Sequence, residues 1–286
     1  MDLSIIIVSF NTKKLLGECL KSLIVNKQSL SLRDGKWQMV DSEVIVVDNA
    51  SEDGSSLMVG KDFPQVKLIE NQENLGYAAA NNQALRQVST PSSTRGAQGK
   101  DCLLLNPDTR VKPGSLELLI QFARKHPEVG IVGAKLVNPD GSVQPSVYHF
   151  PTLWRAIREY WFGQKNVYEK YAPKGKKPVE VEAVTGAAML IPRKTIEKIG
   201  LLDEKYFMYF EDLDYCRRVR GAGFKAYYLP EAEILHYHGQ SAVRVGSKAY
   251  QYLVQSSKIY NGLIKYYLLF LILWIGQKWQ KIFERK

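Results

Sequence analysis

Residues Leu3–Ser9 read LSIIIVS, and residues Glu43–Asp48 read EVIVVD. Both runs are short, mostly apolar and rich in β-branched side chains, which is typical of strands buried on both faces of a parallel sheet. Thr12 follows the first run as a candidate helix cap, and apolar residues then recur at helical spacing. These residues are Leu15, Leu16, Cys19, Leu20 and Leu23. The stretch therefore predicts a strand, a helix and a second strand.

The same alternation continues toward residue 126. Val66–Glu70 predicts a third strand, Tyr77–Val88 a helix, and Cys102–Leu105 a fourth strand. A further helix is expected from about Gly114 to His126. This rhythm predicts an α/β fold with a Rossmann-like, mostly parallel sheet flanked by helices, and a ligand at the carboxyl ends of the strands.

Two stretches interrupt the alternation, and the second half is less regular. Gln28–Ser42 lengthens one crossover, and Val88–Lys100 predicts an exposed loop because it is rich in Ser, Gly, Thr and Pro. We expect an aromatic-rich helix at Trp154–Tyr168 and a basic loop at Lys170–Pro178. Short strands are expected at Val179–Val184, Ala187–Ile191, Lys225–Leu229 and Glu233–His236.

The C-terminal segment has a different pattern. Ser247–Ile264 is amphipathic, and Tyr266–Ile275 (YYLLFLILWI) is apolar on every side. Ten helical residues span about 15 Å, half of a ~30 Å hydrocarbon core, so a membrane-spanning helix is not expected. Aromatic and basic flanks instead favour a helix that lies on an anionic membrane surface. The flanking residues are Trp274, Trp279, Lys278, Lys281, Arg285 and Lys286. The alternatives are a buried helix or a homodimer contact.

Composition limits the class of protein. With 286 residues, 45% of them hydrophobic and 24% charged, the chain is globular rather than disordered, collagen-like or coiled-coil. A net charge of +10 is compatible with phosphorylated ligands, nucleic acid or anionic lipid. Nucleic acid is disfavoured because no RNP-like or helix-turn-helix pattern accompanies the basic residues. Three separated cysteines and no secretory signal favour a reducing, cytoplasmic compartment.

Residues that follow the predicted strands are candidates for binding. The absence of GxGxxG and GxxxxGK[ST] motifs argues against a dinucleotide dehydrogenase and a P-loop NTPase. Asp48 ends the second strand, where its carboxylate could accept from a ribose hydroxyl or a base N–H. Asn74 and Gly76 predict a tight turn into a helix whose start can face an anion.

Four acidic or histidine residues come later in the chain. Asp108, in Asn106-Pro107-Asp108, offers oxygen ligands to Mg²⁺ or Mn²⁺ on a diphosphate, although the motif is also an ordinary turn. Glu211 and Asp212 follow an aromatic run that could contact a sugar, and one carboxylate could take a proton from a hydroxyl. Their alternative role is to complement a helix dipole. His236 is either structural or a metal ligand.

Seven segments, in this order, carry a resemblance to a known family: SIIIVSFN, VIVVDNAS, ENLGYAAANN, LLNPD, TGAAMLIPR, FMYFEDLDYCRR and HYHGQS. The chain closely resembles glycosyltransferase family 2, and within it bacterial rhamnosyltransferase-like members with the GT-A fold. The resemblance implies a GT-A domain at 1–245, with a nucleotide-binding half at about 1–110 and an acceptor half at about 111–245. Residues 246–286 then form a helical, membrane-associating tail.

The resemblance also implies roles for particular residues. Asp212 would be the general base and Glu211 would orient the donor or acceptor. Asp108 would bind the metal, Mn²⁺ or Mg²⁺, as the one carboxylate left of the family's DxD, and His236 would be a metal ligand ahead of His238. The nucleotide-sugar would contact Ser9, Asn11, Asp48, Asn74, Gly76, Asn81, Asn106, Gly186 and Ala187.

The implied activity is inverting transfer of a sugar, with rhamnose a candidate, from a dTDP- or UDP-sugar. The acceptor would be a hydroxyl of a lipid-linked or polysaccharide molecule at the cytoplasmic face of the membrane. A helix start is expected to lower the pKa of Asp212, which would make proton transfer concerted with bond breaking. The alternative is a non-catalytic module of the same fold that binds nucleotide-sugars.

Overall fold

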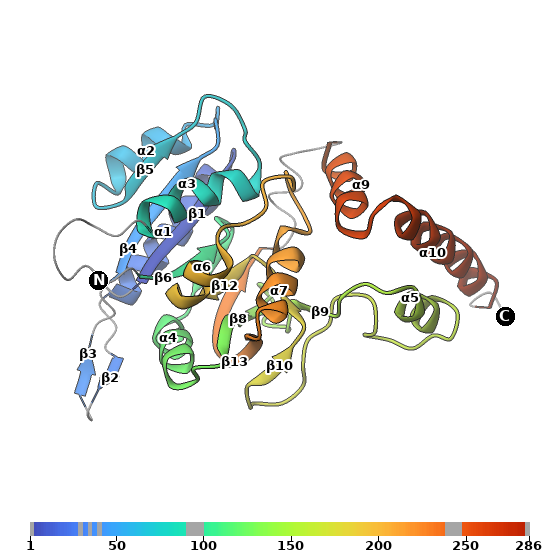
Figure 1. The fold of residues 1–286 in the computed structure, drawn as a ribbon. Helices are drawn as coiled ribbons and strands as arrows, with labels where there is room; N and C mark the ends of the chain where they lie inside the picture. The colour runs from blue at the N-terminus through green and yellow to red at the C-terminus, as the bar shows by residue number, and fades with distance from the viewer. Residues whose placement is uncertain are drawn as a thin grey trace.

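The computed structural model of the chain describes residues 3–27, 31–33, 36–38, 42–89, 100–237 and 248–283 (Figure 1). Within them, nine strands form one central sheet. These strands are β1 (Leu3–Ser9), β4 (Ser42–Asp48), β5 (Lys67–Glu70), β6 (Asp101–Leu105), β7 (Thr109–Val111), β8 (Val129–Val137), β10 (Val179–Val181), β12 (Ala188–Ile191) and β13 (Lys225–His236). Their order is β10-β13-β8-β12-β6-β1-β4-β5, and β7 pairs with β13.

The N-terminal half of the sheet is parallel, as expected. β1 lies between β4 and β6 and is parallel to both, with Ser9 opposite Asp48 and Ile6 opposite Leu104. β12 is antiparallel to β6 and β8, whereas β13 runs parallel to β8. The α/β fold with a mostly parallel sheet is therefore confirmed, and one antiparallel strand separates its two parallel parts.

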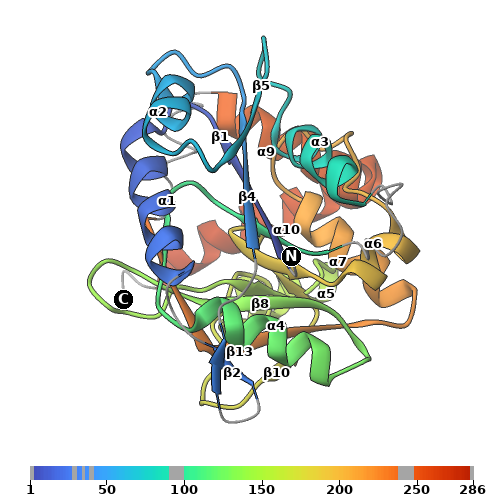
Figure 2. The ribbon, with the colours of Figure 1, turned by 90° about the vertical axis from the view of Figure 1, so that its left-hand side faces the viewer.

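Helices cover both faces of the sheet (Figure 2). They are α1 (Lys13–Lys27), α2 (Ser55–Asp62), α3 (Tyr77–Ser89), α4 (Ser115–Lys125), α6 (Arg193–Ile199) and α7 (Glu211–Gly221). The helices α1, α2 and α4 share one hydrophobic core with the sheet, and α3, α6 and α7 share the other. Leu16 and Leu20 of α1 are fully buried, and each such side chain contributes about 1.5–3 kcal/mol of burial free energy.

Strand β8 has no counterpart among the predicted strands. Its sequence, VGIVGAKLV, contains two glycines that weaken the strand pattern. A Cβ at Gly133 would lie 2.7 Å from the side chain of Val184, so the glycine permits close packing on the sheet. The two strands expected at Lys225–Leu229 and Glu233–His236 are one strand, β13, whose pairing with β8 shifts between Leu229 and Glu233.

The helix expected at Trp154–Tyr168 is wrong in its second half. Helix α5 spans Leu153–Tyr160, and the chain then turns through left-handed residues at Gly163 and Asn166, with φ of 67° and 64°. The carboxylate of Glu159 accepts the N–H groups of residues 167–169, which holds the returning segment against α5.

Two separate pairs of strands lie outside the central sheet. The run Val179–Val184 divides into β10 and β11 (Ala183–Val184), and β11 pairs with β9 (Val147–Tyr148). The lengthened crossover holds a hairpin of β2 (Ser31–Arg33) and β3 (Lys36–Gln38). Most of the loop expected at Val88–Lys100 lies outside the described residues.

Two further helices, α9 (Lys248–Asn261) and α10 (Leu263–Phe283), end the described chain. Helix α10 lies beside α5 (Figure 1), where Trp161 Nε1 donates to the carbonyl of Ile272 at 3.0 Å and Lys265 Nζ donates to Pro151 at 2.8 Å. None of the helices in the described ranges has both the length and the apolarity needed to cross a bilayer.

This helix pair exposes many large apolar side chains, which we call the α5–α10 apolar surface. Trp154 and Phe162 are 61% and 66% exposed, and Ile264 on α10 is 81% exposed. The other members are Trp161, Leu263, Tyr267, Leu268, Phe270, Leu271, Trp274 and Trp279. Exposed apolar area on this scale marks an interaction surface in soluble proteins.

Candidate active site

A cavity of about 430 Å³ opens at the carboxyl edge of the parallel strands. Its wall includes Phe10 after β1, Asn49 after β4, Asn106 after β6 and His236 at the end of β13. Gly186 and Ala187, which precede the antiparallel strand β12, reach the same edge. The volume suits a small-molecule ligand, and the position is the one expected for an open α/β sheet.

Most of the predicted site residues meet in this cavity. Its lining contains Asn74, Gly76, Asn106, Asp108, Gly186, Ala187, Glu211, Asp212 and His236. Four predicted nucleotide-sugar residues are not part of the lining: Ser9, Asn11, Asp48 and Asn81. His238 lies outside the described residues.

These four residues make hydrogen bonds near their own strands and helices. Ser9 Oγ pairs with a threonine hydroxyl at 2.9 Å, and Asn11 Oδ1 accepts the N–H of Glu52 at 2.7 Å. Asp48 Oδ2 accepts the N–H of Ser51 at 3.0 Å, whereas its Oδ1 is buried and accepts no hydrogen bond from the described residues. Asn81 donates to the carbonyl of Tyr77 at 2.9 Å.

Asp108 and His236 lie next to each other in the cavity wall. Both are buried, and His236 Nε2 lies 3.3 Å from Asp108 Oδ1. His236 Nδ1 lies 2.6 Å from Gln144 Oε1, which can only accept, so Nδ1 carries a proton. In the neutral ring, Nε2 then presents its lone pair toward the carboxylate. Asp108 Oδ1 accepts no hydrogen bond from the described residues.

This pair fits a divalent cation. A carboxylate oxygen without a donor and an imidazole nitrogen oriented through its other N–H are typical metal ligands. In the described ranges, no group of three His, Cys, Asp or Glu side chains could hold a metal ion. A cation at Asp108 and His236 would therefore take its remaining ligands from a diphosphate and from water.

Glu211 and Asp212 also line the cavity, from the first turn of α7. They follow two aromatic residues in the left-handed region, Tyr209 with φ of 71° and Phe210 with φ of 68°. Left-handed backbone at a bulky residue costs about 1–2 kcal/mol per residue and is concentrated at functional sites. Here the turn directs both carboxylates into the cavity.

Asp212 is held by two backbone donors. Its Oδ2 accepts the N–H of Gly186 at 3.0 Å, and its Oδ1 accepts the N–H of Leu213 at 2.8 Å. Oε2 of Glu211 is buried and accepts no hydrogen bond from the described residues. The two neighbouring carboxylates therefore have different surroundings.

The expectation that a helix start lowers the pKa of Asp212 is wrong. Burial raises its pKa, and the N–H donors and the charge of Lys170 only partly oppose the shift. Burial and the adjacent Asp212 raise the pKa of Glu211 well above its ordinary value. Glu211 has less hydrogen-bond support for its charged form than Asp212 has, so its carboxyl holds a proton more strongly.

The turn at Asn74 and Gly76 joins the cavity to the aromatic run. Asn49 donates to Asn74 Oδ1 at 2.8 Å, and Asn74 Oδ1 also accepts the N–H of Gly76 at 2.9 Å. The next residue, Tyr77, donates its N–H to the carbonyl of Phe207 at 2.6 Å and its hydroxyl to Gly186 at 2.9 Å. This network connects the turn to Phe207, which precedes Glu211 and Asp212, and to Gly186, whose N–H donates to Asp212.

Helix α9 packs on the other side of the aromatic run. Ser256 Oγ donates to the carbonyl of Met208 at 2.8 Å, and Tyr252 stacks on Phe207 with ring centroids 4.2 Å apart. Leu253 lines the cavity itself. The start of the tail therefore forms part of the site wall.

Several residues of the cavity are missing from the sequence prediction. Asn49 and Tyr77 each adjoin a predicted residue, so the strand-end pattern could have included them. Tyr148, Lys170 and Leu253 reach the cavity through tertiary contacts that no local motif indicates.

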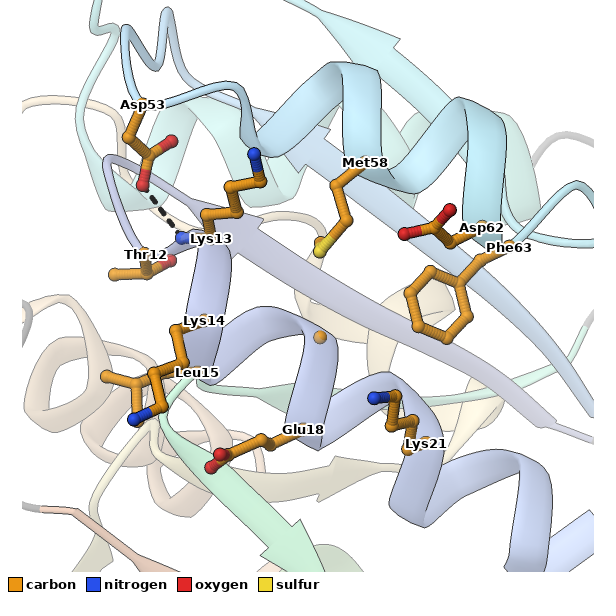
Figure 3. A pocket seen from close by; sticks show the side chains of 11 residues that line it. Thr12, Lys13, Lys14, Leu15, Glu18, Lys21, Asp53, Met58, Asp62 and Phe63 are labelled. Carbon is orange, nitrogen blue, oxygen red and sulfur yellow. Dashed lines mark hydrogen bonds between the residues drawn. The ribbon is translucent and has the colours of Figure 1, made fainter.

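A second hollow, of about 950 Å³, lies between α1 and α2 (Figure 3). Three lysines and three carboxylates line it, so it attracts neither anions nor cations strongly. The backbone N–H of Lys13 donates to Asp53 at 2.8 Å, and Asp53 also accepts from Ser55 at the start of α2. These contacts join two helices, and none of the predicted catalytic residues lines the hollow.

Comparison with known proteins gives consistent results. Residues 2–251 match the family described as "Glycosyltransferase like family 2". The chain is 33% identical over 211 residues to the N-acetylglucosaminyl-diphospho-decaprenol L-rhamnosyltransferase of Mycobacterium tuberculosis (strain ATCC 25618 / H37Rv). That match covers 70% of this chain and 68% of the relative.

Solved structures share the fold. GalNAc-T7, determined with UDP, GalNAc and Mn²⁺, has a TM-score of 0.58 at 14% identity, covering 83% of this chain but only 44% of that protein. Residues 1–349 of S. aureus TarS have a TM-score of 0.56 at 17% identity, covering 96% and 69% of the two chains. The fold is thus GT-A, and the chain belongs to glycosyltransferase family 2, as a glycosyltransferase of the bacterial rhamnosyltransferase-like type.

Proposed function

We propose that this enzyme transfers a sugar from a nucleotide diphosphate to an acceptor hydroxyl by a single, inverting displacement with Asp212 as general base. The observation that carries the proposal is the placement of Asp212 in the same cavity as Asp108 and His236, held there by the N–H of Gly186. The Asp108–His236 pair suits a diphosphate with its cation, and Asp212 suits an incoming alcohol.

Proton removal is the role of Asp212. Both of its oxygens accept backbone N–H groups, so the carboxylate is oriented before the acceptor binds. Burial raises its pKa, which makes it a stronger base than an ordinary aspartate. The acceptor oxygen bonds to the anomeric carbon as its proton passes to Asp212. The carbon–oxygen bond to the diphosphate breaks, and the configuration inverts.

Glu211 serves as a positioning group for the sugars. Its raised pKa favours a protonated carboxyl, which can donate one hydrogen bond and accept another. In the same cavity, Asp108 and His236 would hold Mn²⁺ or Mg²⁺. When bound, the cation offsets the charge of the departing diphosphate.

The donor and acceptor follow from the relatives. The mycobacterial relative is named as an L-rhamnosyltransferase that uses a diphospho-decaprenol acceptor, so we carry over rhamnose from a dTDP- or UDP-sugar and a lipid-linked or polysaccharide acceptor. We also carry over Ser9, Asn11, Asp48 and Asn81 as contacts of the base and ribose. The buried Oδ1 of Asp48 supports this assignment because it has no donor among the described residues.

We further propose that the enzyme binds the cytoplasmic face of the membrane peripherally. The α5–α10 apolar surface supports this location. Lys278 belongs to α10, so anionic lipid complements the surface better than neutral lipid does. The proposed division places the catalytic domain at 1–245 and the tail at 246–286.

The test of catalysis compares Asp212→Asn with wild type in donor hydrolysis and in transfer. The substitution keeps the shape of the side chain but removes the base, so kcat should fall by about 10²–10⁴-fold while donor affinity is retained. Asp62→Asn, at an exposed position that ends α2, is the matched control. Equal rates for Asp212→Asn and wild type would instead favour a non-catalytic binding module.

A further inference from the structure

Lys170 is a cation in an otherwise acidic cavity. Among the described residues that line the cavity it is the only lysine or arginine, whereas Asp108, Glu211 and Asp212 are acidic. Lys170 forms no ion pair with any described residue. Lys170 and Asp212 line the same cavity, and the charge of Lys170 acts on the Asp212 carboxylate.

The position of Lys170 is fixed by its neighbours. The N–H of Tyr171 donates to the carbonyl of Val147 at 3.0 Å, and the N–H of Val147 donates back to Tyr171 at 3.1 Å. The ammonium of Lys170 lies over the ring of Tyr148, 5.2 Å from its centroid. An anchored backbone and an aromatic support preorganise the ammonium for a ligand.

Lys170 follows directly on residues 161–169, and this segment starts at Trp161, a member of the α5–α10 apolar surface. Trp161 contacts α10 through the carbonyl of Ile272, and Glu159 folds residues 167–169 back onto α5. The hydroxyl of Tyr160 donates to Glu169, next to Lys170. Lys170 therefore follows a segment that is folded against α5, and α5 lies beside α10 (Figure 1).

We infer that Lys170 binds the phosphate of the acceptor, so the acceptor is a sugar joined through phosphate to a lipid rather than a polysaccharide. The inference rests on the proposed function. The acceptor hydroxyl would lie at Asp212, its phosphate one sugar ring away at Lys170, and its lipid chain on the α5–α10 apolar surface. Lys170 is exposed, so its ammonium is open to a ligand that enters from solvent, and an ammonium is a strong partner for phosphate.

The electrostatics of Lys170 agree with this role. Loss of water at the cavity wall lowers its pKa, and Asp212 opposes the shift by favouring the charged form. A bound phosphate would favour the charged form further. The donor diphosphate has the same chemistry, and the experiment must separate the two sources.

The test measures binding of farnesyl diphosphate to the full chain by calorimetry, with UDP or dTDP and Mn²⁺ saturating the donor site. Lys170→Met should weaken binding by about tenfold or more, because a charge-assisted hydrogen bond is lost. Lys170→Arg should retain most of the affinity. Lys174→Met, an exposed lysine outside the cavity lining, should behave as wild type. Nucleotide affinity should be equal in all four proteins.

Equal affinity of wild type and Lys170→Met for farnesyl diphosphate would overturn the inference, as would absence of binding by wild type. A parallel loss of nucleotide affinity in Lys170→Met would assign the residue to the donor diphosphate and also overturn it. If wild type binds nucleotide normally, these results leave the proposed function intact. If wild type binds no nucleotide, the proposed function and the inference both fail.

Discussion

Gly76 lies directly against the carbonyl of Phe207: a Cβ at Gly76 would stand 2.4 Å from that oxygen. The glycine also has φ of 84°, a conformation that side chains rarely adopt. The contact joins the turn after β5 to the aromatic run that precedes Glu211 and Asp212. The placement of Glu211 and Asp212 thus depends on a residue from the N-terminal part of the chain.

We expect Gly76→Ala to lower the free energy of unfolding by about 2–4 kcal/mol and to reduce kcat, because the clash displaces the aromatic run. Gly114→Ala is the matched control, since it has φ of 83° but nothing within 4 Å. It should cost about 1 kcal/mol from backbone strain and leave kcat unchanged. Denaturant unfolding and initial rates measure both effects, and similar losses in the two variants would contradict the contact.

Glu211→Gln should stabilise the unliganded protein at high pH. The folded-state pKa of Glu211 is raised above the ordinary 4.5, so the native state binds a proton that the unfolded state has released. Its favourable contribution is complete below pH 4.5 and disappears as pH rises through the folded pKa. The variant should therefore match wild type near pH 4 and exceed it by about 1–2 kcal/mol at pH 8.

Thermal unfolding from pH 4 to 8 measures this difference. Glu231→Gln, an exposed carboxylate on β13, should follow the wild-type curve throughout. A lower melting temperature for Glu211→Gln at pH 8 would contradict the expected sign.

Asp108 and His236 should determine the response to metal. We expect Mn²⁺ to raise the melting temperature of the nucleotide-bound wild type, since a cation that binds only the native state stabilises it. Asp108→Asn and His236→Gln should each remove most of that increase. His149→Gln is the control because His149 pairs with Glu182 and is absent from the cavity lining. A full Mn²⁺ response in Asp108→Asn would exclude this site.

Helix α9 should support turnover more than donor binding. Tyr252→Leu removes the ring that stacks on Phe207, so the turn before Glu211 loses a support and kcat should fall by about tenfold. Tyr250→Leu, at a position 67% exposed on the same helix, is the control. Steady-state kinetics should show little change in the donor KM. Equal kcat values for the two variants would leave α9 without a role in the site.

The α5–α10 apolar surface should determine membrane binding. The double variant Leu271→Glu, Trp274→Glu places two charges on exposed positions of α10 and should reduce flotation with anionic liposomes. Leu57→Glu changes a still more exposed apolar residue on α2, 79% exposed, and should float like wild type. If the double variant floats normally but wild type is a dimer that the variant breaks, the surface is a contact between two copies.

The N-terminal half could be predicted because its signals are local. In β1 and β4 the same short apolar runs that define the strands also bury both faces, so pattern and structure agree. Strand β8 was missed because Gly133 is required by a neighbour, Val184, far away in the chain. Helix α5 was predicted too long because the carboxylate of Glu159, rather than a breaker residue, folds the next segment back.

In the candidate site, too, local sequence patterns predict some residues, whereas tertiary packing alone places others. Asp108 and Asp212 follow recognisable turns at element ends, so the sequence could place them on the sheet edge. Lys170 and Leu253 enter the cavity only because α5 and α9 pack where they do, and no local pattern indicates those contacts. The roles assigned to Ser9 and Asp48 remain predictions.

The contact of α9 with residues 207–210 has a practical consequence for protein production. A fragment that stops before Lys248 would keep every carboxylate of the cavity but lose Tyr252, Leu253 and Ser256. We expect such a fragment to bind nucleotide well and turn over slowly. If shortened versions were chosen for crystallisation by nucleotide binding alone, the choice would therefore favour a protein whose cavity lacks part of its wall.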